Sequence, residues 1–88
     1  MKPPSGWALS PDGKAIHRQF LMRDFTAAVE LIGRIAPIAE QLDHHPDLSL
    51  SSYRKLEITL TTHSAGGLTQ KDLDLAALID ALPKSLKA

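Results

Sequence analysis

A chain of 88 residues is long enough for one small domain and too short for two, because much shorter units usually need disulfides or metal ions to fold alone. Hydrophobic residues make up 43% and charged residues 23%, which excludes disordered and fibrous proteins. Ten basic residues balance ten acidic ones, which argues against direct nucleic-acid binding, and the absence of cysteine excludes disulfides, thiolate metal sites and cysteine nucleophiles. We therefore expect one domain over residues 1–88, with chemistry from histidine, carboxylate or hydroxyl groups.

The chain is expected to be a soluble, cytoplasmic protein without membrane contact. No apolar run approaches the roughly 18 to 20 residues of a membrane span, and residues 1–5 do not resemble a signal peptide. A domain of this size is only marginally stable alone, so association into oligomers is expected.

The first elements are predicted to be two strands, over residues 6–9 and 14–22. Between them Ser10–Pro11–Asp12–Gly13 is typical of a tight turn, since proline presets φ and glycine accepts positive φ. Trp7 and Leu9 are expected to share one face of the first strand. Ile16, Phe20 and Met22 are expected to share one face of the second, interrupted by Arg18.

A helix is predicted next, capped by Asp24 and ending near Leu42. Pro37 lies on the polar side, so the helix is expected to continue through it with a kink. The residues expected to face the core recur at spacings of three and four: Phe25, Ala28, Val29, Ile32, Ile35, Ala36, Ala39 and Leu42.

A second hairpin and a second helix complete the pattern. Leu48 and Leu50, and then Leu56, Ile58 and Leu60, alternate with polar residues on either side of a turn near residues 52–54. The sequence Thr69–Gln70–Lys71–Asp72 is a capping box that opens a helix reaching about residue 82. The order β-β-α-β-β-α predicts an α+β fold, a four-stranded antiparallel sheet covered on one face by two helices.

Three of the four histidines gather at the ends of predicted elements: His44 and His45 after the first helix, and His63 after the last strand. Imidazole exchanges protons near neutral pH, so this grouping indicates general acid–base catalysis. A purely structural role at a helix end is the alternative. The spacing matches no recognised metal-binding motif, so no metal site is predicted.

The spacing of these histidines and their neighbours resembles a known signature. Glu40, His44–His45–Pro46, Tyr53, His63 and Asp72 are arranged as in the active-site pattern of the pterin-4a-carbinolamine dehydratase family. The similarity extends over about residues 6–81 and includes Gly6–Trp7 and Thr59–His63. Family members usually carry a further helix before the Gly–Trp pair, and this helix is expected to be absent here.

The resemblance implies an enzyme that removes water from 4a-hydroxytetrahydropterin to give quinonoid dihydropterin, without a metal or cofactor, in tetrahydrobiopterin recycling. By analogy, His44 and His63 are expected to act as the acid and base, and His45 to orient the pterin. Glu40 and Asp43 are expected to orient the imidazoles or accept hydrogen bonds from the pterin ring.

Other signature positions have structural interpretations. Trp7 is expected either to form an aromatic wall for the pterin or to lie in the core. Asp72 is expected mainly to serve the capping box, Tyr53 to support the hairpin turn, and Pro46 to end the first helix.

The resemblance also implies a homodimer formed through sheet edges, with a tetramer formed through helices as a further option. Two alternatives to the enzyme stay open: a non-catalytic protein-interaction or dimerisation cofactor of the same fold, and a degenerate homologue that binds pterin without turnover.

Overall fold

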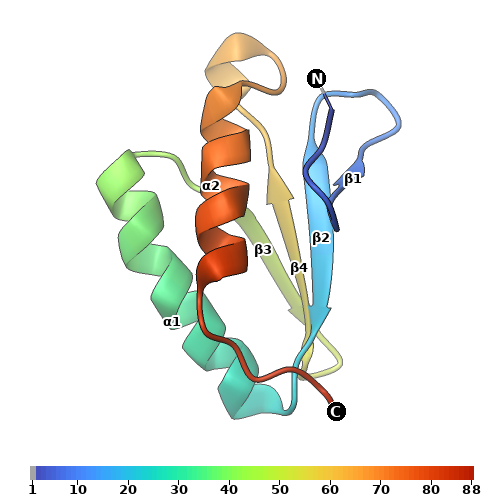
Figure 1. Cartoon of the computed structure of the whole chain (residues 1–88), viewed down its shortest axis with the longest axis vertical. Coiled ribbons are helices and arrows are strands. Elements are labelled where there is room, and N and C mark those ends of the chain that lie inside the picture. The colour runs from blue at the N-terminus through green and yellow to red at the C-terminus, as the bar shows by residue number, and fades with distance from the viewer. Residues whose placement is uncertain (1) are drawn as a thin grey trace.

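A computed structural model describes residues 2–88 of the chain and confirms the predicted α+β fold (Figure 1). The four strands form one antiparallel sheet in the order β1-β2-β4-β3, and both helices lie on the same side of it. A short 3₁₀ turn, His63–Ala65, links the last strand to the last helix. The elements are β1 Ala8–Leu9, β2 Ile16–Leu21, α1 Phe25–Leu42, β3 Asp47–Ser51, β4 Lys55–Leu60 and α2 Gln70–Ala81.

The core lies between the sheet and the helices. Alternate residues of the central strands β2 and β4 point into it, as Ile16 opposite Leu60 and Phe20 opposite Leu56 illustrate. The same alternation continues past the end of β4 to Thr62, which is also buried. Because the alternation along a strand determines which residues face the helices, it also determines which side chains at the strand ends face the site described below.

Helix α1 begins at the predicted cap, and its buried face agrees with the predicted one only in part. The Asp24 side chain accepts a hydrogen bond from the Ala27 N–H, and the helix continues through Pro37 to Leu42. Ala28, Ile35 and Ala39 are buried as predicted. The prediction is wrong for four exposed residues: Phe25, Val29, Ala36 and Leu42. The buried face is made by Ala27, Ala28, Leu31, Ile35 and Ala39. Apolar residues surround much of this helix, so periodicity alone could not select the buried side.

The first hairpin contains the predicted turn, with Gly13 at φ 72° and its N–H donating to the Ser10 carbonyl. Strand β1 has only two residues, and Leu9 is exposed whereas Trp7 is buried, so the two do not share a core-facing side. The indole Nε1–H of Trp7 donates to Asp80 Oδ2 at 3.0 Å. Trp7 is therefore part of the core, at the C-terminal end of α2.

The second hairpin turns through three residues, Ser52, Tyr53 and Arg54, between the paired Ser51 and Lys55, and the φ angles of Ser52 and Tyr53 are 48° and 56°. Tyr53 is exposed, and its ring lies 5.4 Å from the guanidinium carbon of Arg54. Its predicted place at the hairpin turn is confirmed. No helix within residues 2–88 has the length and apolar character needed to cross a membrane.

Candidate active site

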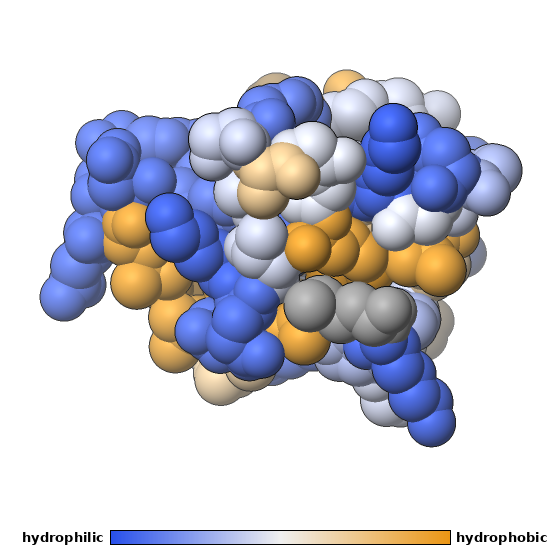
Figure 2. Space-filling view, turned by 90° about the horizontal axis from the view of Figure 1, so that it is seen from above, coloured by the Kyte–Doolittle hydropathy of each residue, from blue (hydrophilic) through white to orange (hydrophobic). Residues whose placement is uncertain are grey.

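Four segments meet at one end of the molecule: the C-terminus of α1, the loop before β3, the end of β4 and the N-terminus of α2 (Figure 1). The hairpin turn of Tyr53 lies at the opposite end. Seen from above, the shared end carries hydrophilic side chains around a narrower apolar band (Figure 2). The three histidines of the signature belong to this end.

The turn after α1 positions the first two histidines. Asp43 adopts the left-handed conformation at φ 50°, which aspartate tolerates better than most residues, and its N–H donates to the Glu40 carbonyl. The His44 N–H donates to the Ala39 carbonyl at 3.1 Å, completing a Schellman motif. Pro46 then forces an extended chain into β3. The His44 backbone is thus fixed before its side chain makes any contact.

The side chain of His44 is held by a buried carboxylate. His44 Nε2 lies 2.6 Å from Asp72 Oδ1, and Asp72 has no exposed surface. Asp72 Oδ2 accepts a hydrogen bond from the Thr69 N–H at 3.0 Å, which is the predicted capping-box contact. The same oxygen accepts from Thr62 Oγ1 at 2.8 Å. The expected structural role of Asp72 is therefore present, together with a contact to His44 that sequence reasoning missed.

The directions of these hydrogen bonds follow from counting protons. The hydroxyl proton of Thr62 goes to Asp72, so the Thr69 hydroxyl must donate to Thr62 Oγ1, 2.8 Å away. A carboxylate can only accept hydrogen bonds, so when Asp72 is a carboxylate, His44 Nε2 carries the proton of that contact. In a neutral imidazole this leaves Nδ1 as the unprotonated nitrogen of His44.

The second histidine is held more loosely. His45 Nε2 lies 3.3 Å from Glu40 Oε1, and both side chains are more than half exposed. Glu40 therefore contacts one imidazole, and its role in orienting that imidazole stays a prediction. Within residues 2–88, the structure gives the Asp43 side chain no hydrogen bond to an imidazole, but Asp43 lines the cavity described next, so its other expected role, accepting hydrogen bonds from a bound ring, stays a prediction.

The third histidine completes a cavity. His63 begins the 3₁₀ turn after β4 and is exposed at the rim. The cavity has a volume of about 390 Å³, large enough for a small bicyclic ligand. Its lining residues are Asp43, His44, His45, Thr61, Thr62, His63, Ser64 and Lys71. The fold thus brings together the three histidines that the sequence singled out.

Four residues that line this cavity were not predicted as site residues, Thr61, Thr62, Ser64 and Lys71, and the predicted Trp7 lies elsewhere. Thr62 continues the inward alternation of Leu56, Ile58 and Leu60, a signal that could have been read from the sequence. The place of Lys71 in the cavity depends on the direction in which the first turn of α2 points, which the sequence alone does not give. Trp7 does not contact the histidine cavity, because it is bonded to Asp80 two helical turns beyond Asp72; the expectation of an aromatic wall is therefore wrong.

Chemically, the cavity offers imidazoles with different surroundings. His44 is 11% exposed and tied to a buried acceptor, whereas His45 is largely exposed. A lysine ammonium and a carboxylate lie on the same wall. This set can accept a proton, donate a proton and hydrogen-bond a polar heterocycle. In the part of the chain that the structure describes, no three histidine or acidic side chains are grouped to hold a metal ion.

Comparisons with known proteins agree with this geometry. A family model described as pterin 4 alpha carbinolamine dehydratase matches residues 1–82. A relative from Rhodopseudomonas palustris (strain BisB18) is 42% identical over 92% of this chain and 79% of its own length. One from Sulfurisphaera tokodaii is 44% identical over 88% of this chain and 80% of its own length. The names of both assign them provisionally as pterin-4-alpha-carbinolamine dehydratases.

Two solved structures are also similar. A transcriptional coactivator/pterin dehydratase from Brucella melitensis superimposes with a TM-score of 0.81 and 36% identity, covering 88% of this chain and 81% of that one. A pterin dehydratase-like protein identified as a RuBisCO assembly factor in the alpha-carboxysome has a TM-score of 0.72 at 17% identity, covering 86% and 87%. The second likeness concerns the fold alone.

Proposed function

Because the chain belongs to the pterin 4 alpha carbinolamine dehydratase family, we propose that it removes water from 4a-hydroxytetrahydropterins to give quinonoid dihydropterin. The observation that supports this most directly is the pairing of His44 with buried Asp72 in a cavity that His45 and His63 also line. Such a substrate arises when a tetrahydropterin serves an aromatic amino acid hydroxylase, so the activity belongs to pterin recycling.

The reaction is an elimination that needs one acid and one base. The C4a–O bond breaks as the leaving hydroxyl takes a proton and departs as water. A ring N–H gives up its proton, and the electron pair of that bond forms the new double bond. No electrons leave the system, so the acid and base alone balance the reaction.

His44 is suited to the base and His63 to the acid. With Nε2–H held by Asp72, the Nδ1 lone pair of His44 is the one left to accept a proton, and the same contact stabilises the imidazolium that results. His63, at the open rim, can exchange protons with solvent between turnovers. Each proton transfer of this kind contributes about 10² to 10⁴ in rate.

The remaining cavity residues bind and orient the substrate. His45, steadied by Glu40, borders the same space, and Asp43 supplies a carboxylate that can accept hydrogen bonds from the amino and imino groups of a pterin. Lys71 supplies a donor for its carbonyl oxygen. The family resemblance implies His45, Glu40 and Asp43, whereas Lys71 is proposed here from the cavity lining alone.

The test is the absorbance change as chemically generated 4a-hydroxytetrahydropterin loses water. Wild-type protein is expected to accelerate the change over buffer, and His44→Ala and His63→Ala to slow the catalysed rate by about 10²-fold or more. His17→Ala is the matched control, because His17 lies on β2 and lines none of the cavity. A wild-type rate equal to that of buffer would exclude the enzyme, and equal rates for all four proteins would exclude the histidine assignment.

We further propose that the chain forms a homodimer in the cytoplasm. Strand β3 is paired only with β4 and leaves its other edge open, while Phe25 and Val29 are exposed on α1. The open edge of β3 favours a dimer. The exposed apolar face of α1 favours a larger assembly or the binding of a protein partner, and such a partner corresponds to the non-catalytic alternative. Light scattering on the purified protein gives the mass, and a monomer at micromolar concentration would refute the dimer.

A further inference from the structure

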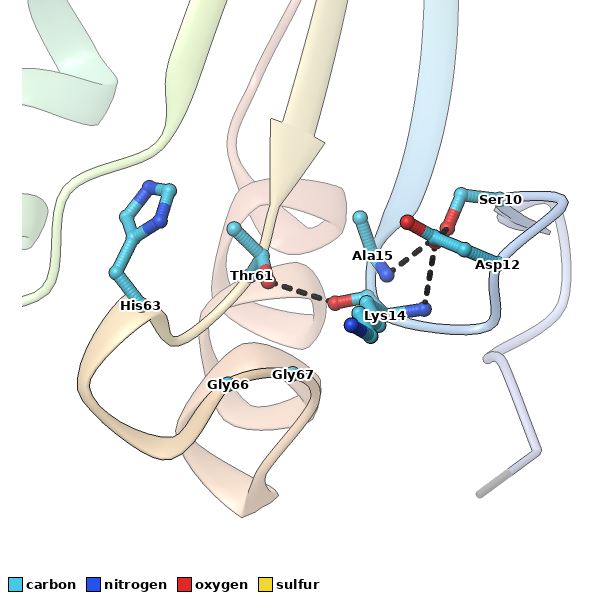
Figure 3. A pocket seen from close by; sticks show the side chains of 8 residues that line it. All are labelled: Ser10, Asp12, Lys14, Ala15, Thr61, His63, Gly66 and Gly67. Atoms are coloured by element: carbon cyan, nitrogen blue, oxygen red, sulfur yellow. Dashed lines mark hydrogen bonds between the residues drawn. The ribbon is translucent and has the colours of Figure 1, made fainter.

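A second cavity lies beside the histidine cavity and shares a wall with it. It has a volume of about 400 Å³ and is formed by the loop between β1 and β2, the end of β4 and the turn before α2. Thr61 and His63 line both cavities. Figure 3 shows the residues that line it, with His63 and Thr61 on one side and the loop of Asp12 and Lys14 on the other. The two cavities therefore adjoin at Thr61 and His63.

The loop that forms the far wall is held in one conformation. Asp12 Oδ1 accepts hydrogen bonds from Ser10 Oγ at 2.7 Å and from the Lys14 N–H at 3.0 Å, and Ser10 Oγ accepts from the Ala15 N–H at 3.0 Å. Thr61 Oγ1 donates to the Lys14 carbonyl at 2.6 Å, which ties the loop to the end of β4 (Figure 3). The wall is thus built before any ligand arrives.

Glycines keep the floor of the groove open. Gly66 has a φ of 73°, a conformation in which a side chain would be strained, and apart from its chain neighbours no atom of residues 2–88 lies within 4 Å of where its Cβ would be. Gly67 lies beside Lys14, at van der Waals distance from where its Cβ would be. Space remains for a short chain of a few atoms beside the polar groups.

The wall offers both a hydrogen-bond acceptor and a hydrogen-bond donor. Asp12 and Lys14 lie on the same loop, and within residues 2–88 neither is in an ion pair. The hydrogen bonds from Ser10 and from the Lys14 N–H lower the pKa of Asp12, so it is ionised at neutral pH. A neutral group with hydroxyls can donate to Asp12 and accept from Lys14.

We propose that this groove binds a neutral hydroxylated side chain at C6 of the pterin, and so determines which pterin the protein prefers; the proposal rests on the proposed function. The flat ring occupies the histidine cavity, and the side chain passes the shared wall of Thr61 and His63. Asp12 accepts a hydrogen bond from one hydroxyl, and Lys14 donates to another.

The test compares three unreactive dihydropterins that differ only at C6, carrying methyl, hydroxymethyl or dihydroxypropyl, by isothermal titration calorimetry. Wild-type affinity is expected to rise along that series, with the dihydroxypropyl compound about three- to tenfold tighter than the methyl compound. We expect Asp12→Asn and Lys14→Gln each to lower this ratio of the affinity for the dihydroxypropyl compound to that for the methyl compound. The double variant should bring the ratio near one. Asn keeps an acceptor for Ser10 and for the Lys14 N–H, so the loop conformation is preserved.

The control is the double variant Lys55→Gln with Glu57→Gln, which removes the same two charges from exposed positions of β4 away from the groove and keeps the wild-type ratio. Equal wild-type affinity for all three pterins, with dehydration still accelerated, would overturn the groove proposal alone. Equal weakening of all three in the loop variants would also overturn it. A protein that binds no pterin and accelerates no dehydration would refute both proposals.

Discussion

The contact between Asp72 and His44 provides the sharpest test of the proposed mechanism, through the variant Asp72→Asn. Asparagine has the same shape as aspartate, and its carbonyl oxygen can still accept from the Thr69 N–H and from Thr62, as Oδ2 does now. The amide then points its N–H groups at His44 Nε2. To avoid two opposed donors, a neutral His44 must carry its proton on Nδ1 instead, so the nitrogen proposed to act as base becomes a donor.

The expected magnitudes follow from these contacts. The start of α2 keeps its cap, but one buried charge-assisted hydrogen bond of 2.6 Å is replaced by a neutral one, so the free energy of unfolding should fall by about 1–3 kcal/mol. Loss of the base at Nδ1 should lower kcat/KM by about 10² to 10³, equivalent to about 2.7–4.1 kcal/mol of transition-state stabilisation. The effect on catalysis should therefore exceed the effect on folding.

A double-mutant cycle with His44→Ala separates these effects. Dehydration rates of the wild type, both single variants and the double variant are measured by absorbance, and unfolding free energies by urea denaturation. If Asp72 acts on catalysis through His44, adding Asp72→Asn to His44→Ala should lower kcat/KM no further. The same fold-loss in both backgrounds would refute the reasoning, because it would show that Asp72 affects the rate by another route.

Three further predictions concern the supporting structure. Thr62→Val keeps the side-chain shape but removes the donor to buried Asp72, so urea denaturation should show a free energy of unfolding lower by about 1–3 kcal/mol; an unchanged value would exclude that hydrogen bond. Trp7→Phe should lower it by about 1 kcal/mol through loss of the bond to Asp80 and leave the dehydration rate unaltered, whereas a large loss of rate would place the indole in the site after all. The hydrogen bond from the Ala27 N–H lowers the pKa of Asp24 below 3.8, so the stabilisation from Asp24 is fully present above that pH and is lost as the pH falls through the lowered value. The midpoint temperature of thermal unfolding should therefore fall less for Asp24→Asn than for the wild type between pH 5 and pH 2. Equal falls in this temperature would contradict the prediction.

Much of the fold could be predicted because local signals and the sheet period agree. The turn at Ser10–Gly13, the cap at Asp24 and the capping box at Thr69 each depend on contacts within a few residues. The limits of the buried side of α1 could not be predicted, because apolar residues such as Phe25 and Ala28 satisfy the same spacing and only packing against the sheet decides between them.

The site was predictable as a group of histidines but not as a network. The family resemblance pointed to Asp72, whereas its contact with His44 joins residues 28 positions apart and requires knowledge of how α2 crosses the end of the sheet. The opposite holds for Trp7, where a bond to Asp80 across 73 positions places an aromatic residue in the core rather than in the site. Long-range hydrogen bonds of this kind leave no periodic trace in the sequence.

Asp72 caps the first turn of α2 and restrains His44 with the same carboxyl group. The start of α2 and the His44 side chain are therefore expected to open together in one local unfolding event. When the first turn of α2 frays, the amides there become exposed to solvent and His44 loses its partner at the same moment. A ligand that requires His44 in place therefore binds only the closed form and stabilises it in proportion to its occupancy. Occupation of the cavity should consequently slow amide hydrogen exchange at the start of α2, including amides that the ligand never touches.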